Sequence, residues 1–161
     1  MGIRTGCFPG EIILIRLERV IMEDVKNLTA TGCNRGIALL VEDNEINAAI
    51  VKNQLVNFGF EVEWVANGAR DVEYFGDSKE GHYSIVVMDL MMPVMDGIEA
   101  TRIIRKLSRN DAKTVPIIAV TANTYQEDRK ACEESGITGF ITKPYMINQL
   151  KEVIDNLTEI A

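Results

Sequence analysis

From residue 37 onward, the chain alternates short apolar segments with longer segments in which apolar residues recur every three or four positions. The segments at 37–41 and 84–88 are almost wholly apolar, which is typical of strands buried on both faces. The segment at 60–65 alternates apolar and acidic residues, as a strand with one exposed face would. The pattern predicts strands at 37–41, 60–65, 84–88, 116–120 and 138–142, and helices at 44–58, 67–75, 96–107, 124–135 and 146–160.

Five strand–helix units in this order predict an α/β fold. Buried strands that are separated by helices pair in parallel, and right-handed crossovers then place helices on both faces of the sheet. We therefore expect a doubly wound (βα)5 three-layer sandwich with the flavodoxin-like parallel sheet order 2-1-3-4-5. Ligands of such sheets bind beyond the carboxyl ends of the strands, so the residues at those ends are the first candidates for a functional site.

The first 36 residues do not share this pattern and carry a different charge. Residues 1–36 have five basic and four acidic side chains, a net charge of +1, whereas residues 37–161 have twelve basic and twenty acidic ones, a net charge of −8. We therefore expect an N-terminal extension or linker at 1–36 and a compact domain at 37–161. Apolar residues at helical spacing predict a helix near 11–28, and both a linker or dimerising helix and a loosely packed tail fit this segment.

The composition narrows the function classes. The 161 residues include 17 Lys and Arg against 24 Asp and Glu, a formal net charge of −7, so the basic face of a nucleic-acid-binding protein is not expected. No apolar run approaches the roughly 20 residues of a membrane-spanning helix, so we expect no membrane contact. Three cysteines without close spacing and a single histidine argue against a disulfide framework or a zinc site and favour a cytoplasmic protein.

Chemically distinctive side chains follow four of the five predicted strands: Glu42 and Asp43, Asp89, Thr121, and Lys143. Each one alone is typical of a helix cap, a turn or a solvated surface position. Because the carboxyl ends of parallel strands meet at one edge of the sheet, we expect the set to converge. Three neighbouring carboxylates repel one another and favour an oxygen-ligated cation, either Mg²⁺ or Mn²⁺. A carboxylate beside such a metal can attack phosphorus and form an aspartyl phosphate.

Four separated motifs carry a resemblance to a known family: LLVEDNEIN at 39–47, MDLMMPVMDG at 88–97, AVTAN at 119–123 and FITKP at 140–144. Together they resemble the receiver domain of two-component response regulators over residues 37–161. The E-D-N-x-x-N start and the M-P-V-M-D-G loop are most similar to receivers of hybrid sensor histidine kinases. The resemblance implies a phospho-accepting receiver in a two-component phosphorelay, which acts as a conformational switch rather than as a turnover enzyme.

The resemblance implies a phosphorylation site with bound Mg²⁺. Asp89 matches the phosphoacceptor, and both Asp43 and Asp89 match direct metal ligands. Met91 matches the position whose main-chain carbonyl binds the metal, and Glu42 matches the acidic neighbour that acts through a metal-bound water. Lys143 matches the lysine that contacts the phosphoryl group. The implied phosphoryl donor is a phosphohistidine on a histidine kinase or on a histidine phosphotransfer domain.

The resemblance also implies a switch that responds to the phosphoryl group. Thr121 matches the hydroxyl that turns towards it, and Phe140 matches the aromatic side chain that then moves inward. This movement would alter a surface near Tyr125 and Tyr145 that a downstream protein partner recognises. The residues that match loop-shaping positions are Pro93, Gly97 and Pro144, of which Pro144 is expected to follow a cis peptide bond.

Three other functions compete with this interpretation. A degenerate receiver that serves only as a protein-interaction module would have lost pocket residues that are present here. A haloacid-dehalogenase-type phosphohydrolase, with an Asp nucleophile, would need a second Asp where Met91 stands. A flavodoxin-like or dinucleotide-binding module would need a phosphate-binding first loop, which Glu42 and Asp43 would oppose by repulsion.

We expect the aspartyl phosphate to be long-lived, because the apolar Met91, two residues after Asp89, cannot orient an attacking water by hydrogen bonding. Asn123, two residues after Thr121, is the second position that the resemblance links to this lifetime. The measurement is the decay of the phosphorylated protein after the phosphoryl donor has been removed. Decay as fast as that of the quickest receivers would contradict the prediction.

Overall fold

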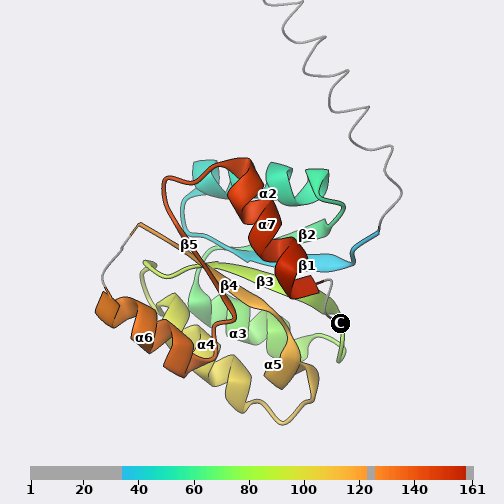
Figure 1. The fold of residues 1–161 in the computed structure, drawn as a ribbon. Helices are drawn as coiled ribbons and strands as arrows, with labels where there is room; N and C mark the ends of the chain where they lie inside the picture. Colours follow the sequence, from blue (N-terminus) through green and yellow to red (C-terminus); the bar gives the residue numbers. More distant parts are fainter. Residues whose placement is uncertain (1–33, 123–125, 159–161) are drawn as a thin grey trace, which may run out of the picture. The chain divides into compact units, whose positions relative to one another are not determined.

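The computed structural model describes residues 34–122 and 126–158, which form a parallel sheet with helices on both faces (Figure 1). The strands are β1 (Ile37–Val41), β2 (Glu61–Val65), β3 (Tyr83–Asp89), β4 (Ile117–Thr121) and β5 (Gly139–Thr142). The helices are α2 (Glu45–Asn57), α3 (Gly68–Asp77), α4 (Gly97–Lys106), α5 (Asp111–Thr114), α6 (Gln126–Ser135) and α7 (Ile147–Thr158). The strand order is β2-β1-β3-β4-β5 with parallel pairing throughout, which confirms the predicted doubly wound fold.

The predicted elements differ from the observed ones mainly at their ends. Each predicted strand is present with shifts of no more than one residue, but Asp89 and Thr121 are the last residues of β3 and β4 instead of following them. The sequence did not predict α5, because its four residues are too short to show helical periodicity. The parts of the sequence analysis that lie wholly or mainly outside the described residues are the helix at 11–28, the extension at 1–36, Asn123 and Tyr125.

Both faces of the sheet are covered. Helices α2 and α7 lie on one face, and α3, α4, α5 and α6 lie on the other (Figure 1). Along β1, Ala38 and Leu40 pack in the cluster on the α2 and α7 side, whereas Leu39 and Val41 pack in the cluster on the other side. All four are buried, which explains why this strand shows no alternation of polar and apolar residues. In the described ranges, none of the helices combines the length and the apolar character needed to span a bilayer.

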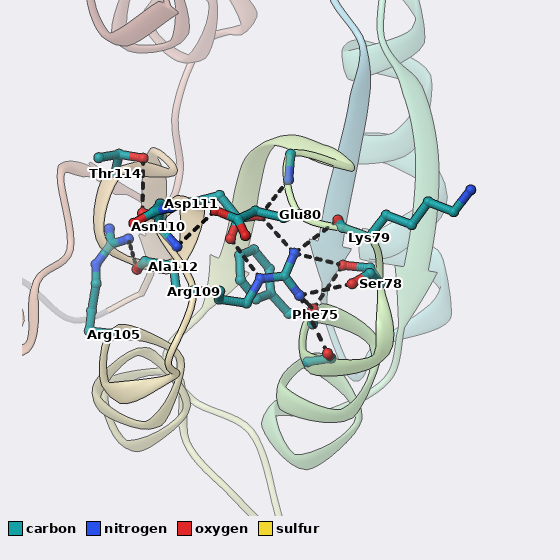
Figure 2. Close-up of polar contacts among 12 residues, drawn as sticks. Phe75, Ser78, Lys79, Glu80, Arg105, Arg109, Asn110, Asp111, Ala112 and Thr114 are labelled. Carbon is teal, nitrogen blue, oxygen red and sulfur yellow. Dashed lines mark hydrogen bonds and ion pairs between the residues drawn. The ribbon is translucent and has the colours of Figure 1, made fainter.

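Arg109, in the loop between α4 and α5, ties that loop to the end of α3 (Figure 2). Its guanidinium donates hydrogen bonds to the main-chain oxygens of Phe75 at 2.6 Å, Ser78 at 3.0 Å and Lys79 at 2.9 Å. It also pairs with Asp111 at 2.6 Å and lies over the Phe75 ring, 4.8 Å from the ring centroid. The last carbonyl oxygens of a helix have no hydrogen-bond donor within the helix. Arg109 therefore supplies donors to the carbonyl oxygens at the end of α3. This cluster lies where the chain enters β3, so it stabilises the end of the sheet opposite the strand carboxyl ends.

Helix α3 places a carboxyl group in the core. Asp71 lies on the buried face of α3 together with Gly68 and Phe75, and its exposed fraction is 0%. Neither of its carboxylate oxygens has a hydrogen-bond partner within the described part of the chain. Because burial disfavours the charged form, it raises the pKa of Asp71 to about 8. The folded protein therefore keeps the Asp71 proton at neutral pH, whereas the unfolded chain releases it.

Replacing Asp71 with Ala should stabilise the protein, and more so as the pH rises. Between an ordinary Asp pKa of 3.8 and about 8, only the folded protein retains the proton, so the free energy of unfolding of the wild type falls with rising pH. One pKa unit corresponds to about 1.4 kcal/mol, so we expect a gain of at most about 4 kcal/mol at pH 7. Urea unfolding of the wild type and of Asp71→Ala, at pH 5 and at pH 8, measures this difference.

The control for this experiment is Asp77→Ala, on the exposed side of the same helix. The free energy of unfolding of Asp77→Ala should stay within about 0.5 kcal/mol of the wild-type value at both pH values, as is usual for substitutions at surface positions. Equal pH dependence in the wild type and in Asp71→Ala would contradict the prediction.

Candidate functional site

The carboxyl ends of four strands bring the predicted site residues to one edge of the sheet. Asp89 ends β3, which lies between β1 and β4, and Thr121 ends β4. Glu42 follows β1 and extends the ladder, because its N–H donates to the Val65 oxygen of β2 at 3.1 Å. Lys143 follows β5, and its N–H donates to the Thr121 oxygen at 2.7 Å. The sheet thus fixes the backbone from which these side chains project.

The ammonium of Lys143 joins two of the carboxylates. Its Nζ donates to Oδ2 of Asp89 at 2.6 Å and to Oε2 of Glu42 at 2.9 Å. Burial disfavours the protonated ammonium, but the hydrogen bonds to Asp89 and Glu42 outweigh it, and the pKa of Lys143 rises above its usual value. Lys143 therefore stays cationic and offsets part of the repulsion between the two acidic side chains.

Three carboxylates form a candidate cation site. One oxygen from each of Glu42, Asp43 and Asp89 lies within 4.8 Å of the others. Glu42 and Asp89 are buried, whereas Asp43 is exposed and opens the cluster to solvent. With Lys143, the formal charges sum to −2, which a divalent cation would neutralise. The oxygen-only donor set fits Mg²⁺, which typically takes one or two carboxylates and keeps several waters.

The loop after β3 holds the carboxylate of Asp89 from its other side. The main-chain N–H of Met91 donates to Oδ1 of Asp89 at 2.9 Å, so both oxygens of Asp89 accept a hydrogen bond. Met91 is 67% exposed, and its main-chain carbonyl is the metal ligand that the resemblance implies. The expected contribution of that carbonyl stays a prediction.

Gly97 allows this loop to pack against β3. A Cβ atom at Gly97 would lie 2.6 Å from the main-chain oxygen of Asp89 and 2.8 Å from the sulfur of Met88. Since real Cβ atoms do not approach other atoms so closely, any larger residue would displace the end of β3. Pro93 lies in the same loop, and its carbonyl accepts a hydrogen bond from the N–H of Met95 at 3.0 Å. The loop-shaping roles of Pro93 and Gly97 stay a prediction.

The two predicted switch residues lie on neighbouring strands and on the same face of the sheet. Phe140 pairs with Ala119, and Thr142 pairs with Thr121, so Thr121 stands two residues beyond the partner of Phe140. Side chains two residues apart in a strand share a face. Phe140 packs beside Ala119, Leu90 and Cys132, towards α6, and Thr121 is buried with an exposed fraction of 1%. The Lys143–Pro144 peptide bond is cis, as predicted.

Two further residues hold Glu42, and the sequence analysis did not single them out. The side-chain amide of Asn47 donates to Oε1 of Glu42 at 3.2 Å, from the first turn of α2. The indole N–H of Trp64 donates to the main-chain oxygen of Glu42 at 2.8 Å, from the end of β2. Asn47 is the last residue of the motif LLVEDNEIN at 39–47, one of the four motifs on which the resemblance rests. Trp64 carries only a weak signal, as the single tryptophan of the chain on the apolar face of a predicted strand.

The chain matches a known family in sequence. Residues 38–155 match the family described as the response regulator receiver domain. The hybrid signal transduction histidine kinase I of Dictyostelium discoideum is 35% identical over 119 residues, which are 73% of this chain and 7% of the relative. The peroxide stress-activated histidine kinase mak1 of Schizosaccharomyces pombe is 35% identical over 132 residues, 81% of this chain and 8% of the relative. The chain therefore spans under a tenth of the length of either relative, at 7% and 8%.

Solved structures match the fold as well. The receiver domain of a sensor histidine kinase from Pseudomonas aeruginosa, with a magnesium ion coordinated in its active site cleft, has a TM-score of 0.68 and 34% identity. The match covers 77% of this chain and 98% of that chain. The chemotaxis protein CheY4 of Vibrio cholerae has a TM-score of 0.69 and 26% identity, over 76% of this chain and 98% of that one. These matches confirm the resemblance that the four motifs indicated.

Replacing Lys143 with Met should destabilise the protein when no divalent cation is present. The change leaves the buried carboxylates of Glu42 and Asp89 without their shared cation. We expect a loss of about 2 kcal/mol, below that of a fully buried pair because the Lys143 side chain is 23% exposed. Added Mg²⁺ should restore most of the loss, and urea unfolding with a chelator and with Mg²⁺ measures both values.

The matched control is Lys130→Met, which breaks a surface pair with Glu134 at 3.7 Å, where the Lys130 side chain is 79% exposed. Such a pair contributes about 0–1 kcal/mol, so this variant should stay close to the wild type in both media. A Lys143→Met protein as stable as the wild type in chelator would show that the ammonium does not offset the carboxylate repulsion.

Proposed function

The chain belongs to the response regulator receiver family, and from that premise we propose that Asp89 accepts a phosphoryl group from a phosphohistidine. The observation that carries the proposal is the arrangement around Asp89. Its carboxylate lies beside the Lys143 ammonium, at 2.6 Å, and within a cluster of three carboxylates that suits a divalent cation. Phosphoryl transfer depends mostly on positioning and on charge neutralisation, and this arrangement supplies both.

The proposed step exchanges one bond to phosphorus for another. A carboxylate oxygen of Asp89 attacks the phosphorus in line, the P–O bond forms, and the P–N bond to the donor imidazole breaks with its electron pair returning to the imidazole. The ammonium of Lys143 moves from Asp89 to a phosphoryl oxygen, and the hydroxyl of Thr121 donates to another. When bound, Mg²⁺ or Mn²⁺ neutralises charge that develops on the phosphoryl oxygens. Its ligands would be Asp43, Asp89 and the Met91 carbonyl, with Glu42 acting through a water.

The consequence of phosphorylation is a change of shape rather than turnover of a substrate. Once Thr121 has moved towards the phosphoryl group, Phe140, on the same face of the neighbouring strand, fills the space that it leaves. The side chains of α6 and β5 that pack around Phe140 would then rearrange. This rearrangement would alter the populations of the surface conformations that a downstream protein recognises. Tyr145, two residues after Lys143 and hydrogen-bonded to Gln54 at 3.3 Å, packs against the core cluster on the α2 and α7 side of the sheet.

The phosphoryl donor would dock beside the opening of the site. Ile46 and Ile50 on α2 are 73% and 53% exposed, which is unusual for isoleucine. Ile50 also lines a largely apolar hollow of about 300 Å³ together with Lys143, Pro144 and Tyr145. An exposed apolar area of this kind marks a protein interaction site. We therefore propose that this apolar area binds the helical surface of a histidine kinase or a histidine phosphotransfer domain. We also propose that the domain lies in the cytoplasm, where such donors meet receivers.

Two alternative functions fit these contacts less well. A degenerate receiver that serves only for interaction would have no need for a lysine bound to both Asp89 and Glu42. An Asp-nucleophile phosphohydrolase would require an acid–base group two residues after Asp89, where the exposed Met91 stands. The receiver function uses each of these groups.

Incubation with phosphoramidate tests the proposal, because its P–N bond mimics phosphohistidine and no cognate kinase is needed. With Mg²⁺, the wild type should gain the mass of one phosphoryl group, and Asp89→Asn should gain none because a neutral amide is a far weaker nucleophile than a carboxylate. A chelator should abolish the gain in the wild type. Asp77→Asn is the matched control, since it makes the same chemical change at an exposed site on α3. Phosphorylation of Asp89→Asn to the wild-type level would remove Asp89 from its proposed role.

A further inference from the structure

We propose that Trp64 is a positioning residue for divalent-cation binding, which rests on the function proposed above. Its indole N–H donates to the main-chain oxygen of Glu42 at 2.8 Å. This oxygen belongs to the peptide group that leads directly into Asp43, the exposed carboxylate of the acidic cluster. The hydrogen bond therefore fixes the direction from which the Asp43 side chain leaves the backbone.

The position of Trp64 in the sheet explains why its side chain reaches this peptide. Trp64 lies in the edge strand β2 and pairs with Leu40 of β1, while the next pair is Val65 with Val41. The alternation of the strand places Trp64 on the face of Val62, towards α2. From there, the long indole side chain passes the end of the ladder and meets the loop between β1 and α2. The smaller side chains that occupy most strand positions would not reach the Glu42 oxygen.

The loop around Asp43 is held on both sides, and Trp64 provides one of these contacts. Before Asp43, Glu42 donates its N–H to Val65 and accepts from Trp64 at its oxygen. After Asp43, the N–H of Asn44 donates to Oε1 of Glu42 at 3.3 Å, and the Asn44 side chain caps α2 by accepting from the main chain at 3.0 Å. The backbone of Asp43 is thus restrained although its side chain faces solvent.

Trp64 is only partly buried. The residue is 39% exposed and stands in an edge strand, so a replacement that keeps the shape of the ring can remove the hydrogen bond and preserve the packing. Groups that orient metal ligands without touching the metal typically change the affinity by about 10–100-fold when they are lost. Because Trp64 acts on one ligand through the backbone, we expect a loss near the lower end of that range, about tenfold.

The experiment compares Mg²⁺ affinity in three variants of the full chain by isothermal titration calorimetry. Trp64→Phe keeps an aromatic ring and removes the donor. Replacement of Trp64 by β-(3-benzothienyl)alanine keeps the bicyclic shape and exchanges only the N–H for sulfur. Tyr74→Phe is the control, because it removes a hydroxyl group from another aromatic side chain with a similar exposure of 44%, on α3. Both Trp64 variants should bind Mg²⁺ about tenfold more weakly than the wild type, and Tyr74→Phe should bind it equally well.

Urea unfolding in chelator provides the second measurement. If the substitutions affect the metal site and not the fold, both Trp64 variants should have a free energy of unfolding close to that of the wild type. In the wild type, Trp64 is the single tryptophan, so its fluorescence should also respond to Mg²⁺, and this response should vanish in Asp43→Asn.

The outcomes distinguish this inference from the function on which it rests. A wild type that does not bind Mg²⁺ would overturn the metal site itself. A wild type that binds Mg²⁺, with both Trp64 variants within twofold of its affinity, would overturn the role of Trp64 alone. Should Trp64→Phe fail to fold, the benzothienyl variant decides, because it preserves the packing of the ring.

Discussion

The ammonium of Lys143 between Asp89 and Glu42 is the interaction on which the rest of the site depends. The two carboxylates are nearly inaccessible to water, with exposed fractions of 8% and 3%, so their mutual repulsion is weakly screened. Lys143 reaches both of them, at 2.6 Å and 2.9 Å, and allows the cluster to exist in a folded protein before any cation binds. Without such a counter-charge, the two buried carboxylates would repel each other and destabilise the arrangement of the site.

The strand order determines how this contact is made. Asp89 ends β3 and Glu42 follows the adjacent strand β1, whereas Lys143 follows β5, with β4 between β5 and β3. A side chain from β5 must therefore pass the end of β4 to reach Asp89, which requires the length of lysine. The base of that side chain is fixed by the main-chain hydrogen bond from Lys143 to Thr121, at 2.7 Å. The same short stretch thus places the counter-charge and connects it to the predicted switch residue.

The sequence predicted the sheet well because burial on both faces leaves an unmistakable apolar run in β1 and β3. It also predicted which side chains meet, since parallel strands end at a common edge. It did not reveal α5, whose four residues show no period. It also did not reveal the hydrogen bond from Trp64 to Glu42, because residue type does not indicate which partner a side chain reaches. The sequence did not predict the burial of Asp71 for a related reason. An acidic residue within an amphipathic helix looks solvated until the structure shows that it faces the core.

The choice of lysine as the counter-charge also suits the proposed chemistry better than arginine would. Arginine binds a carboxylate through a planar fork of two parallel hydrogen bonds, which would hold Asp89 in one pairing. Lysine is a point charge on a flexible stem, so its ammonium can exchange one oxygen partner for another without a loss of geometry. Its remaining exposure of 23% leaves room for that movement. In the proposed function, the group that relieves the repulsion in the resting protein would therefore transfer to a phosphoryl oxygen on Asp89, and its departure from Glu42 would leave that carboxylate for a metal-bound water.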